Sequence, residues 1–183
     1  MRITDNRSGF GLVSIVNHWI AAALMLLLLG IAMVFDELPR GDARSSLMAL
    51  HVSIGALAAL YLAFRVVWHF AQARPDPLPA PRWQLTAASF IQNALLLVIA
   101  ILIVTGPLIP WAEGRDLAVF NWFSVPAPFA VSHDIGEMVE ELHEIAGKPV
   151  LILLVAVHAA GALKHALLDR DNTLSRMLRP AKN

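Results

Sequence analysis

Four long stretches of almost unbroken apolar residues dominate the chain, at residues 12–35, 47–70, 85–109 and 150–168. Each is close to the roughly 20 residues that a helix needs to cross the hydrocarbon core of a bilayer. None alternates between polar and apolar residues, which excludes a transmembrane β-barrel. An acidic lead-in extends the fourth stretch back to residue 137. The pattern therefore predicts an all-α membrane protein, a bundle of four transmembrane helices at about 12–35, 47–70, 85–109 and 137–168.

The composition agrees with this fold class and limits the number of domains. Of the 183 residues, 57% are hydrophobic and only 15% are charged, with no cysteine. That balance is too apolar for an ordinary soluble domain. Little chain remains outside the helices, so residues 1–183 are expected to form one membrane domain. The first stretch is too long for a signal-peptide core and no small-residue cleavage site follows it, so it is expected to be retained.

The charged residues predict how the helices are oriented. If the four helices alternate, one side holds ten basic and four acidic residues, and the other holds four basic and ten acidic residues. The formal charges are +6 and −6, so the positive-inside rule places both termini in the cytoplasm. The inner basic residues are Arg2, Arg7, Arg65, Arg74, Arg82, Lys164, Arg170, Arg176, Arg179 and Lys182; the outer ones are Arg40, Arg44, Arg115 and Lys148.

Two connecting segments have distinctive sequences. Residues 74–82 are proline-rich and are expected to form an extended connector on the inner side. The loop at about 110–136 carries Trp111, Trp122, Phe123 and Phe129, which suit an aromatic cap at the outer membrane interface. Neither segment has the basic array of a nucleic-acid site, so no nucleic-acid partner is expected.

The histidines carry the candidate chemistry. Because successive helices run in opposite directions, His18 lies near the inner side and His51 near the outer side. On the fourth helix, His143 lies at the outer end and His158 in the inner half, about 22 Å apart and about 60° around the helix. His18 and His158 therefore share one depth, and His51 and His143 share another.

Two imidazole pairs at two depths are what two bis-histidine haems require. Small residues lie within one turn of each histidine (Ala22, Gly55, Gly147 and Gly161), which leaves room for a flat macrocycle. Glycine is also common in membrane helices for close packing alone. A zinc site would gather four ligands at one depth, whereas these four histidines lie at two depths. A proton relay would place Asp and Glu within the spans, which contain almost none. Covalent attachment of a c-type haem needs cysteine.

The remaining histidines have simpler interpretations. His69 falls on the same helical face as His51, about 27 Å further inward, and is an alternative inner ligand to His18. It lies beyond Arg65 towards the interface, which favours His18. His133 is expected in a solvated loop. A single histidine in an apolar helix is more often a hydrogen-bonded packing residue than a metal ligand.

Four segments of the sequence resemble the histidine motifs of the bacterial cytochrome b561 family. They are "SIVNHWIAA", "LHVSIGAL", "LHEIAGK" and "HAAGALKHALLDRDNTLSRM", which cover the chain in order. The similarity is weakest at residues 110–136. The resemblance implies a four-helix protein of the bacterial inner membrane with two b haems. No catalytic residue is expected, because the redox chemistry belongs to the haem. The resemblance places the axial ligands on His18, His51, His143 and His158.

The same resemblance implies superoxide oxidation at the periplasmic side coupled to reduction of ubiquinone. It suggests a quinone site at His165, beside Lys164, where an imidazole could supply a proton. His165 could equally be an interfacial residue that contacts lipid headgroups. Two other functions stay open: an electron carrier between quinol and a periplasmic redox protein, and a haem subunit of a larger complex.

Overall fold

The chain folds into four long helical segments. The structure, a computed structural model, describes residues 2–181; Lys182, one of the inner basic residues, lies outside them. The first three segments are α1 (Leu12–Glu37), α2 (Asp42–Ala71) and α3 (Arg82–Ala112), and the fourth spans His133–Asp169. Each is long and apolar enough to cross a membrane. The predicted fold class, a four-helix membrane bundle, is confirmed.

The fourth segment is not one regular helix. It consists of α4 (His133–Ile145), the π-helical turn η1 (Ala146–Val150), α5 (Leu151–Lys164) and a second π turn, η2 (His165–Asp169). Pro149 lies within η1. Proline cannot donate a backbone hydrogen bond and its ring clashes with the preceding turn, which the wider π turn relieves. A π turn holds one residue more than an α-helical turn. The angle around the helix from His143 to His158 is therefore about 100° smaller than in a regular α-helix.

The segment between α3 and α4 is more ordered than a loop. The helix α3 continues through Pro107 and Pro110 to Ala112, and Gly114, with φ +70°, allows the chain to turn after it. The strands β1 (Leu117–Val119) and β2 (Phe123–Val125) then form an antiparallel hairpin. The loop predicted at about 110–136 therefore contains regular structure that the sequence pattern did not indicate. His133, expected in that loop, begins α4 instead, although its side chain is exposed as expected.

Two hydrogen bonds hold the hairpin against the helices. The backbone N–H of Phe120 donates to Ser53 Oγ on α2 at 2.8 Å, and Trp111 Nε1 on α3 donates to the carbonyl oxygen of Val125 at 3.1 Å. Leu117 and Val119 are buried, whereas Trp122 is 73% exposed. The hairpin therefore lies against the side of α2 and beside the carboxyl end of α3, and it leaves aromatic side chains on its outside.

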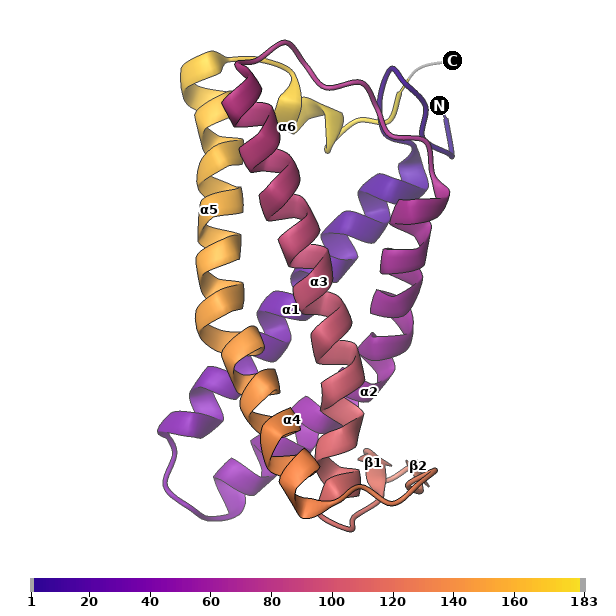
Figure 1. Cartoon of the computed structure of the whole chain (residues 1–183), viewed down its shortest axis with the longest axis vertical. Helices are drawn as coiled ribbons and strands as arrows, with labels where there is room; N and C mark the ends of the chain where they lie inside the picture. The colour runs from indigo at the N-terminus through magenta and orange to yellow at the C-terminus, as the bar shows by residue number, and fades with distance from the viewer. Residues whose placement is uncertain (1, 182–183) are drawn as a thin grey trace.

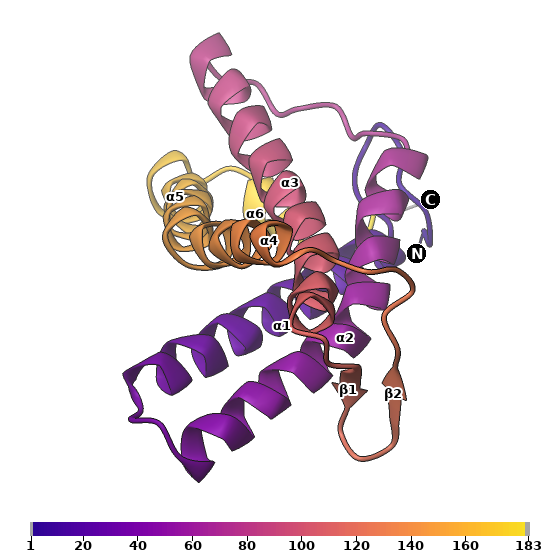
Figure 2. The same cartoon turned by 60° about the horizontal axis from the view of Figure 1, so that its bottom comes forward.

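The helices are arranged as two pairs. The helix α1 packs along α2, and α3 packs along α4 and α5, while α2 also packs against α3 and so connects the pairs. Figure 2 shows α1 and α2 side by side, apart from α5. The first and last residues that the structure describes, Arg2 and Ala181, lie at the end of the bundle opposite the hairpin (Figure 1). There the backbone N–H of Ala181 donates to the carbonyl oxygen of Phe10 at 2.9 Å. The short helix α6 (Thr173–Arg176) lies at this same end, at the top of Figure 1.

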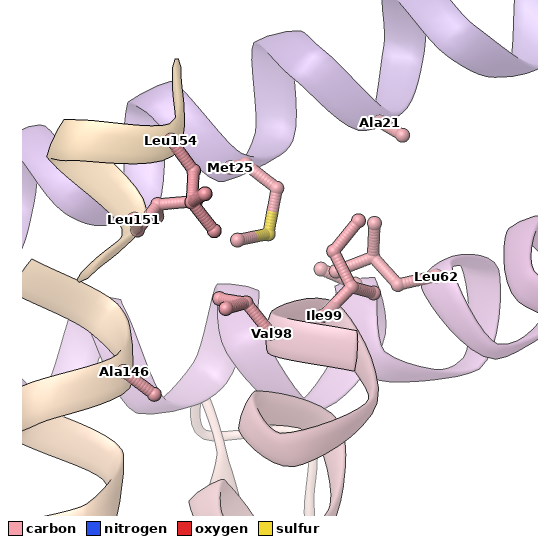
Figure 3. Close-up of a cluster of buried hydrophobic side chains, with 9 residues drawn as sticks. Ala21, Met25, Leu62, Val98, Ile99, Ala146, Leu151 and Leu154 are labelled. Carbon is pink, nitrogen blue, oxygen red and sulfur yellow. The ribbon is translucent and has the colours of Figure 1, made fainter. Parts of the chain in front are cut away.

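A single apolar cluster joins the two helix pairs. Figure 3 shows Met25 of α1 between Leu154 of α5 and Val98 of α3. The buried members are Ala21, Met25, Ala58, Leu62, Val98, Ile99, Ala146, Leu151 and Leu154. On the fourth segment these residues fall between His143 and His158. The cluster therefore forms an apolar layer between the two depths at which the histidines lie.

Candidate functional site

Four histidines form two pairs, and each pair joins one helix pair to the other. His51 of α2 faces His143 of α4, with ring centroids 6.5 Å apart and ring planes at 85°. His18 of α1 faces His158 of α5, with centroids 6.1 Å apart and planes at 55°. We call His51 and His143 the hairpin pair, and His18 and His158 the terminal pair. The structure brings together the same partners that helix direction predicts.

The spacing within each pair fits an iron held between two imidazoles. A metal–imidazole bond is about 2 Å long and a ring nitrogen lies about 1 Å from its ring centroid, so two axial imidazoles place their centroids about 6 Å apart. Both observed separations match that value. Each of these rings is partly buried. The residues present therefore fit a bis-histidine haem at each of the two positions, and their role as ligands stays a prediction.

Both rings of the hairpin pair are also fixed through their second nitrogen. His51 Nδ1 lies 3.1 Å from the carbonyl oxygen of Leu28, which can only accept, so this nitrogen carries the proton. His143 Nδ1 lies 2.8 Å from Thr105 Oγ1. A hydrogen bond at Nδ1 leaves Nε2 as the nitrogen that can bind a metal. Sequence reasoning missed Thr105, because nothing in an apolar helix marks one threonine as facing a histidine 38 residues away.

The terminal pair has different surroundings. Within residues 2–181, neither ring of this pair makes a hydrogen bond; His18 instead packs edge-on against Trp19, with centroids 5.3 Å apart. The neighbouring Asn17 is 2% exposed, and both polar atoms of its side chain lack a partner. A buried amide without hydrogen bonds is unusual and costs free energy.

The small residues near the histidines divide into two kinds. A Cβ added at Gly161 would meet no atom within 4 Å, and one at Gly55 would reach only Leu28 Cδ2, at 4.0 Å. These two glycines leave room beside His158 and His51. Gly147 instead lies against α3, where an added Cβ would be 3.3 Å from Leu102 Cδ2. Gly55 and Gly161 therefore fit the predicted space for a macrocycle, whereas Gly147 serves helix packing.

The distance between the two pairs follows from the α1 backbone. His51 contacts the carbonyl of Leu28, ten residues along α1 from His18. Ten residues of α-helix rise about 15 Å. The apolar cluster around Met25 fills this interval (Figure 3). The two positions are therefore separate sites on opposite sides of a dry layer.

A polar cluster lies at the terminal end of the fourth segment. His165 Nδ1 lies 2.7 Å from Asp171 Oδ2 and 3.1 Å from Asp169 Oδ2, and Lys164 Nζ lies 2.5 Å from the same Asp169 oxygen. Asp171 Oδ1 also accepts from the Thr173 N–H at 2.8 Å. Burial opposes ionisation of Asp171, but the hydrogen bonds from Thr173 and His165 outweigh it and hold the pKa of Asp171 below its ordinary value.

The sequence pointed to His165 and Lys164 but not to these two aspartates. Arg170 has a left-handed backbone, with φ +51°, and this turn brings Asp171 back to His165. Spacing alone gave no sign of that reversal. His69, the alternative inner ligand, packs against Phe70 and faces no other histidine within the described residues.

The outer basic residues are mostly engaged. Lys148 forms ion pairs with Asp36 and with Glu144, the latter at 3.6 Å, and Arg115 pairs with Glu113. Arg44 lies over the Phe35 ring, 5.9 Å from its centroid, and Phe35 packs edge-on against His51. Lys148 and Arg44 are thus close to the hairpin pair, but carboxylates already neutralise two of the four cations.

Comparison with known proteins gives a family and two curated relatives. The family described as prokaryotic cytochrome b561 matches residues 9–180. "Cytochrome b561 homolog 2" of Escherichia coli (strain K12) is 34% identical over 182 residues, which cover 97% of this chain and 95% of the relative. "Cytochrome b561 homolog 1" of the same organism is 25% identical over 171 residues, or 92% and 96% of the two chains.

Proposed function

The chain belongs to the prokaryotic cytochrome b561 family of transmembrane electron-transfer proteins with b-type haems, and on this basis we propose that it carries two of them. One haem is held by the hairpin pair and the other by the terminal pair. The observation that carries the proposal is the pair of ring separations, 6.5 Å and 6.1 Å, at two depths of one bundle. Residues 1–183 then form a single di-haem domain.

The protein's own contribution is to hold the two haems, to orient them and to keep them apart. His18, His51, His143 and His158 supply the axial nitrogens, and the apolar layer around Met25 keeps water from the space between the two sites. When bound, haem supplies reversible one-electron transfer. The multi-pass helices place this chemistry in a membrane, and the prokaryotic family supports the bacterial inner membrane. The distribution of basic residues favours an orientation with both termini in the cytoplasm. The hairpin then faces the periplasm.

We propose that electrons enter at the hairpin side from superoxide and leave at the terminal side to ubiquinone. Two superoxide anions give two molecules of O₂ and two electrons, and ubiquinone takes both electrons and two protons to become ubiquinol. His165 supplies protons to the quinone oxygens and regains them from water on the cytoplasmic side. Lys164, beside it, holds Asp169 in place. The cluster at His165 lies about 10 Å beyond His158 along the helix.

The charge around the hairpin pair favours a second candidate function. The outer face has a formal charge of −6, and Lys148 and Arg115 are paired with carboxylates. Such a face repels a small anion at long range and attracts a basic protein. An electron carrier between quinol and a basic periplasmic redox protein would suit this surface better than an enzyme that oxidises superoxide.

Purified protein distinguishes these functions. We expect an absorption spectrum with two non-covalent b haems per chain, and reduction of added ubiquinone when superoxide is generated. Replacing Arg40, Arg44, Arg115 and Lys148 together by Gln should slow superoxide oxidation about tenfold at low salt, since charge steering changes association rates by factors of ten to a thousand.

The salt dependence supplies the control. A basic donor protein should bind the acidic rim, lose rate as salt rises and be little affected by the four Gln substitutions. If superoxide reduces neither haem at any ionic strength while the basic protein does, the carrier function replaces the oxidase function. One haem per chain would contradict both.

A further inference from the structure

Thr105 makes two short contacts from a buried position at the depth of the hairpin pair. It lies on α3 and is 4% exposed. Its Oγ1 atom is 2.8 Å from the carbonyl oxygen of Ile101, one turn earlier on the same helix, and 2.8 Å from Nδ1 of His143 on α4. A threonine hydroxyl has one hydrogen to donate and lone pairs with which to accept.

Counting hydrogens leaves one arrangement in which both contacts are attractive. The carbonyl oxygen of Ile101 can only accept, so the single hydroxyl hydrogen of Thr105 must point to it. The Thr105 oxygen must then accept, and Nδ1 of His143 must carry a hydrogen and donate. If the hydroxyl instead donated to Nδ1, two acceptor oxygens would lie 2.8 Å apart with no hydrogen between them.

We propose that Thr105 is a positioning residue for the haem of the hairpin pair. Its oxygen fixes His143 with the proton on Nδ1, so that Nε2 is the ligating nitrogen, and it strengthens the donor character of the ring. The inference rests on the proposed function in one respect, namely that His143 binds iron. His51 is fixed in the same protonation state by the Leu28 carbonyl, so both rings of this pair offer the same nitrogen.

The close packing of α3 against α4 holds the His143 ring in place beside Thr105. A Cβ added at the next residue, Gly106, would lie 3.5 Å from Cε1 of His143, so the ring lies against the α3 backbone. Further towards the hairpin, α4 approaches α3 so closely that a Cβ at Gly136 would be 2.6 Å from the Ala112 Cβ. Both glycines keep the helices close, and the ring has little freedom to turn away from Thr105.

A hydrogen bond from Nδ1–H has a defined effect on a metal-bound imidazole. It increases electron donation to the metal, and loss of such a partner typically costs about 10- to 100-fold in metal affinity or activity. Greater donation favours ferric over ferrous iron. Removing the acceptor should therefore raise the midpoint potential of one haem and leave the other unchanged, because neither ring of the terminal pair bonds to Thr105.

The test compares Thr105→Val with Thr105→Ser in the purified, haem-loaded protein. Valine keeps the shape and removes the acceptor, whereas serine keeps the acceptor. Potentiometric titration should show the Val variant with one midpoint raised by about 59 mV, a tenfold change in the oxidised-to-reduced ratio for a one-electron couple, and the Ser variant close to wild type. The shifted haem should be the one that His143→Ala removes.

Thr86→Val is the matched control. Thr86 also lies on α3 and donates to the carbonyl four residues earlier, Arg82, at 3.1 Å, but it is exposed and contacts no histidine. It should leave both midpoints unchanged. Unchanged midpoints in Thr105→Val, or an equal shift of both haems, would overturn the positioning role, as would loss of both haems in that variant. If His143→Ala retains two haems, the ligand assignment itself fails, whatever Thr105 does.

Discussion

The two histidine pairs have the same ligand type and almost the same ring separation, yet their polar surroundings differ. Each ring of the hairpin pair has a hydrogen-bond partner at Nδ1, from Leu28 or Thr105. Neither ring of the terminal pair has one within the described residues, and His18 lies next to a buried amide without partners. One site is thus fixed by the protein's polar groups, and the other mainly by packing.

This difference gives the protein a means of making two chemically equal ligand sets unequal. Haem potentials respond to hydrogen bonding at the axial ligands, to burial and to nearby charge. The hairpin pair has the Nδ1 partners and the nearby ion pair of Lys148 with Asp36, whereas the terminal pair has Trp19 and the buried Asn17. We expect two distinguishable potentials, which is what directed electron transfer across the apolar layer requires.

Replacing single histidines should have the largest effect, because each replacement should remove one haem and leave the other. We expect His51→Ala and His143→Ala each to lose the haem of the hairpin pair, and His18→Ala and His158→Ala each to lose the other, because an iron with one axial imidazole is held weakly. Haem stoichiometry should fall from two to one per chain, and difference spectra should fall into two groups. Equivalent spectra for His51→Ala and His158→Ala would show that the pairing is wrong.

His133→Ala is the control for these variants. His133 lies on the same helical segment as His143, at its exposed end, and its nearest charged partner is Glu137 at 3.6 Å. It should retain both haems with unchanged spectra. His69→Ala should do the same, because His69 faces Phe70 and not the terminal pair.

How much of this site follows from sequence depends on the kind of information involved. Depth is encoded in chain position, because helices of known direction rise about 1.5 Å per residue, and chain position alone is therefore enough to pair the four histidines. The hydrogen bonds to Leu28 and Thr105 could not be predicted, since they depend on which faces of two helices meet. The π turn at Pro149 and the left-handed Arg170 likewise depend on local backbone geometry.

Ion pairs between charged side chains could not be predicted from the sequence either. Counting the charged residues placed Arg40, Arg44, Arg115 and Lys148 on the outer side, without saying which of them have an acidic partner. The structure pairs Lys148 and Arg115 with carboxylates, which a count of residues per side cannot reveal. The hairpin was missed for a related reason: strands of three residues each are too short to produce an alternating pattern.

A smaller effect is expected from a change at the terminal end of the bundle, which should alter the reaction there without loss of haem. His165→Ala should keep both haems and slow ubiquinone reduction by about 100-fold, the lower range for loss of a general acid. Stopped-flow reduction of the haems by the donor should be unchanged, because His165 lies at the terminal end. His133→Ala, at the opposite end of the same segment, is the control. An unchanged quinone rate at saturating donor would make His165 an interfacial residue only.

The smallest effect concerns residues 171–177, which form the C-terminal segment next to the terminal pair. Trp19 Nε1 donates to the carbonyl oxygen of Met177 at 2.8 Å, so this segment touches the residue next to His18. Asp171 holds the start of the segment through Thr173 and His165. Because its pKa is lowered in the folded protein, its stabilisation is present above its ordinary pKa of about 3.9 and is lost as pH falls below it.

We therefore expect acidification below about pH 4 to alter Trp19 fluorescence and the absorption of the terminal-pair haem before the other haem responds. Asp171→Asn should show the altered state already at neutral pH and lose this pH dependence. Trp19→Phe should remove the change in fluorescence on acidification, although the other four tryptophans still emit. The change should be modest, since the Asp171 side chain is 28% exposed and water screens its interactions. An identical acid transition in wild type and Asp171→Asn would mean that another group controls the segment. If both haems respond at the same pH, acid changes both ends of the bundle together, and the prediction of a separate change at the terminal pair is wrong.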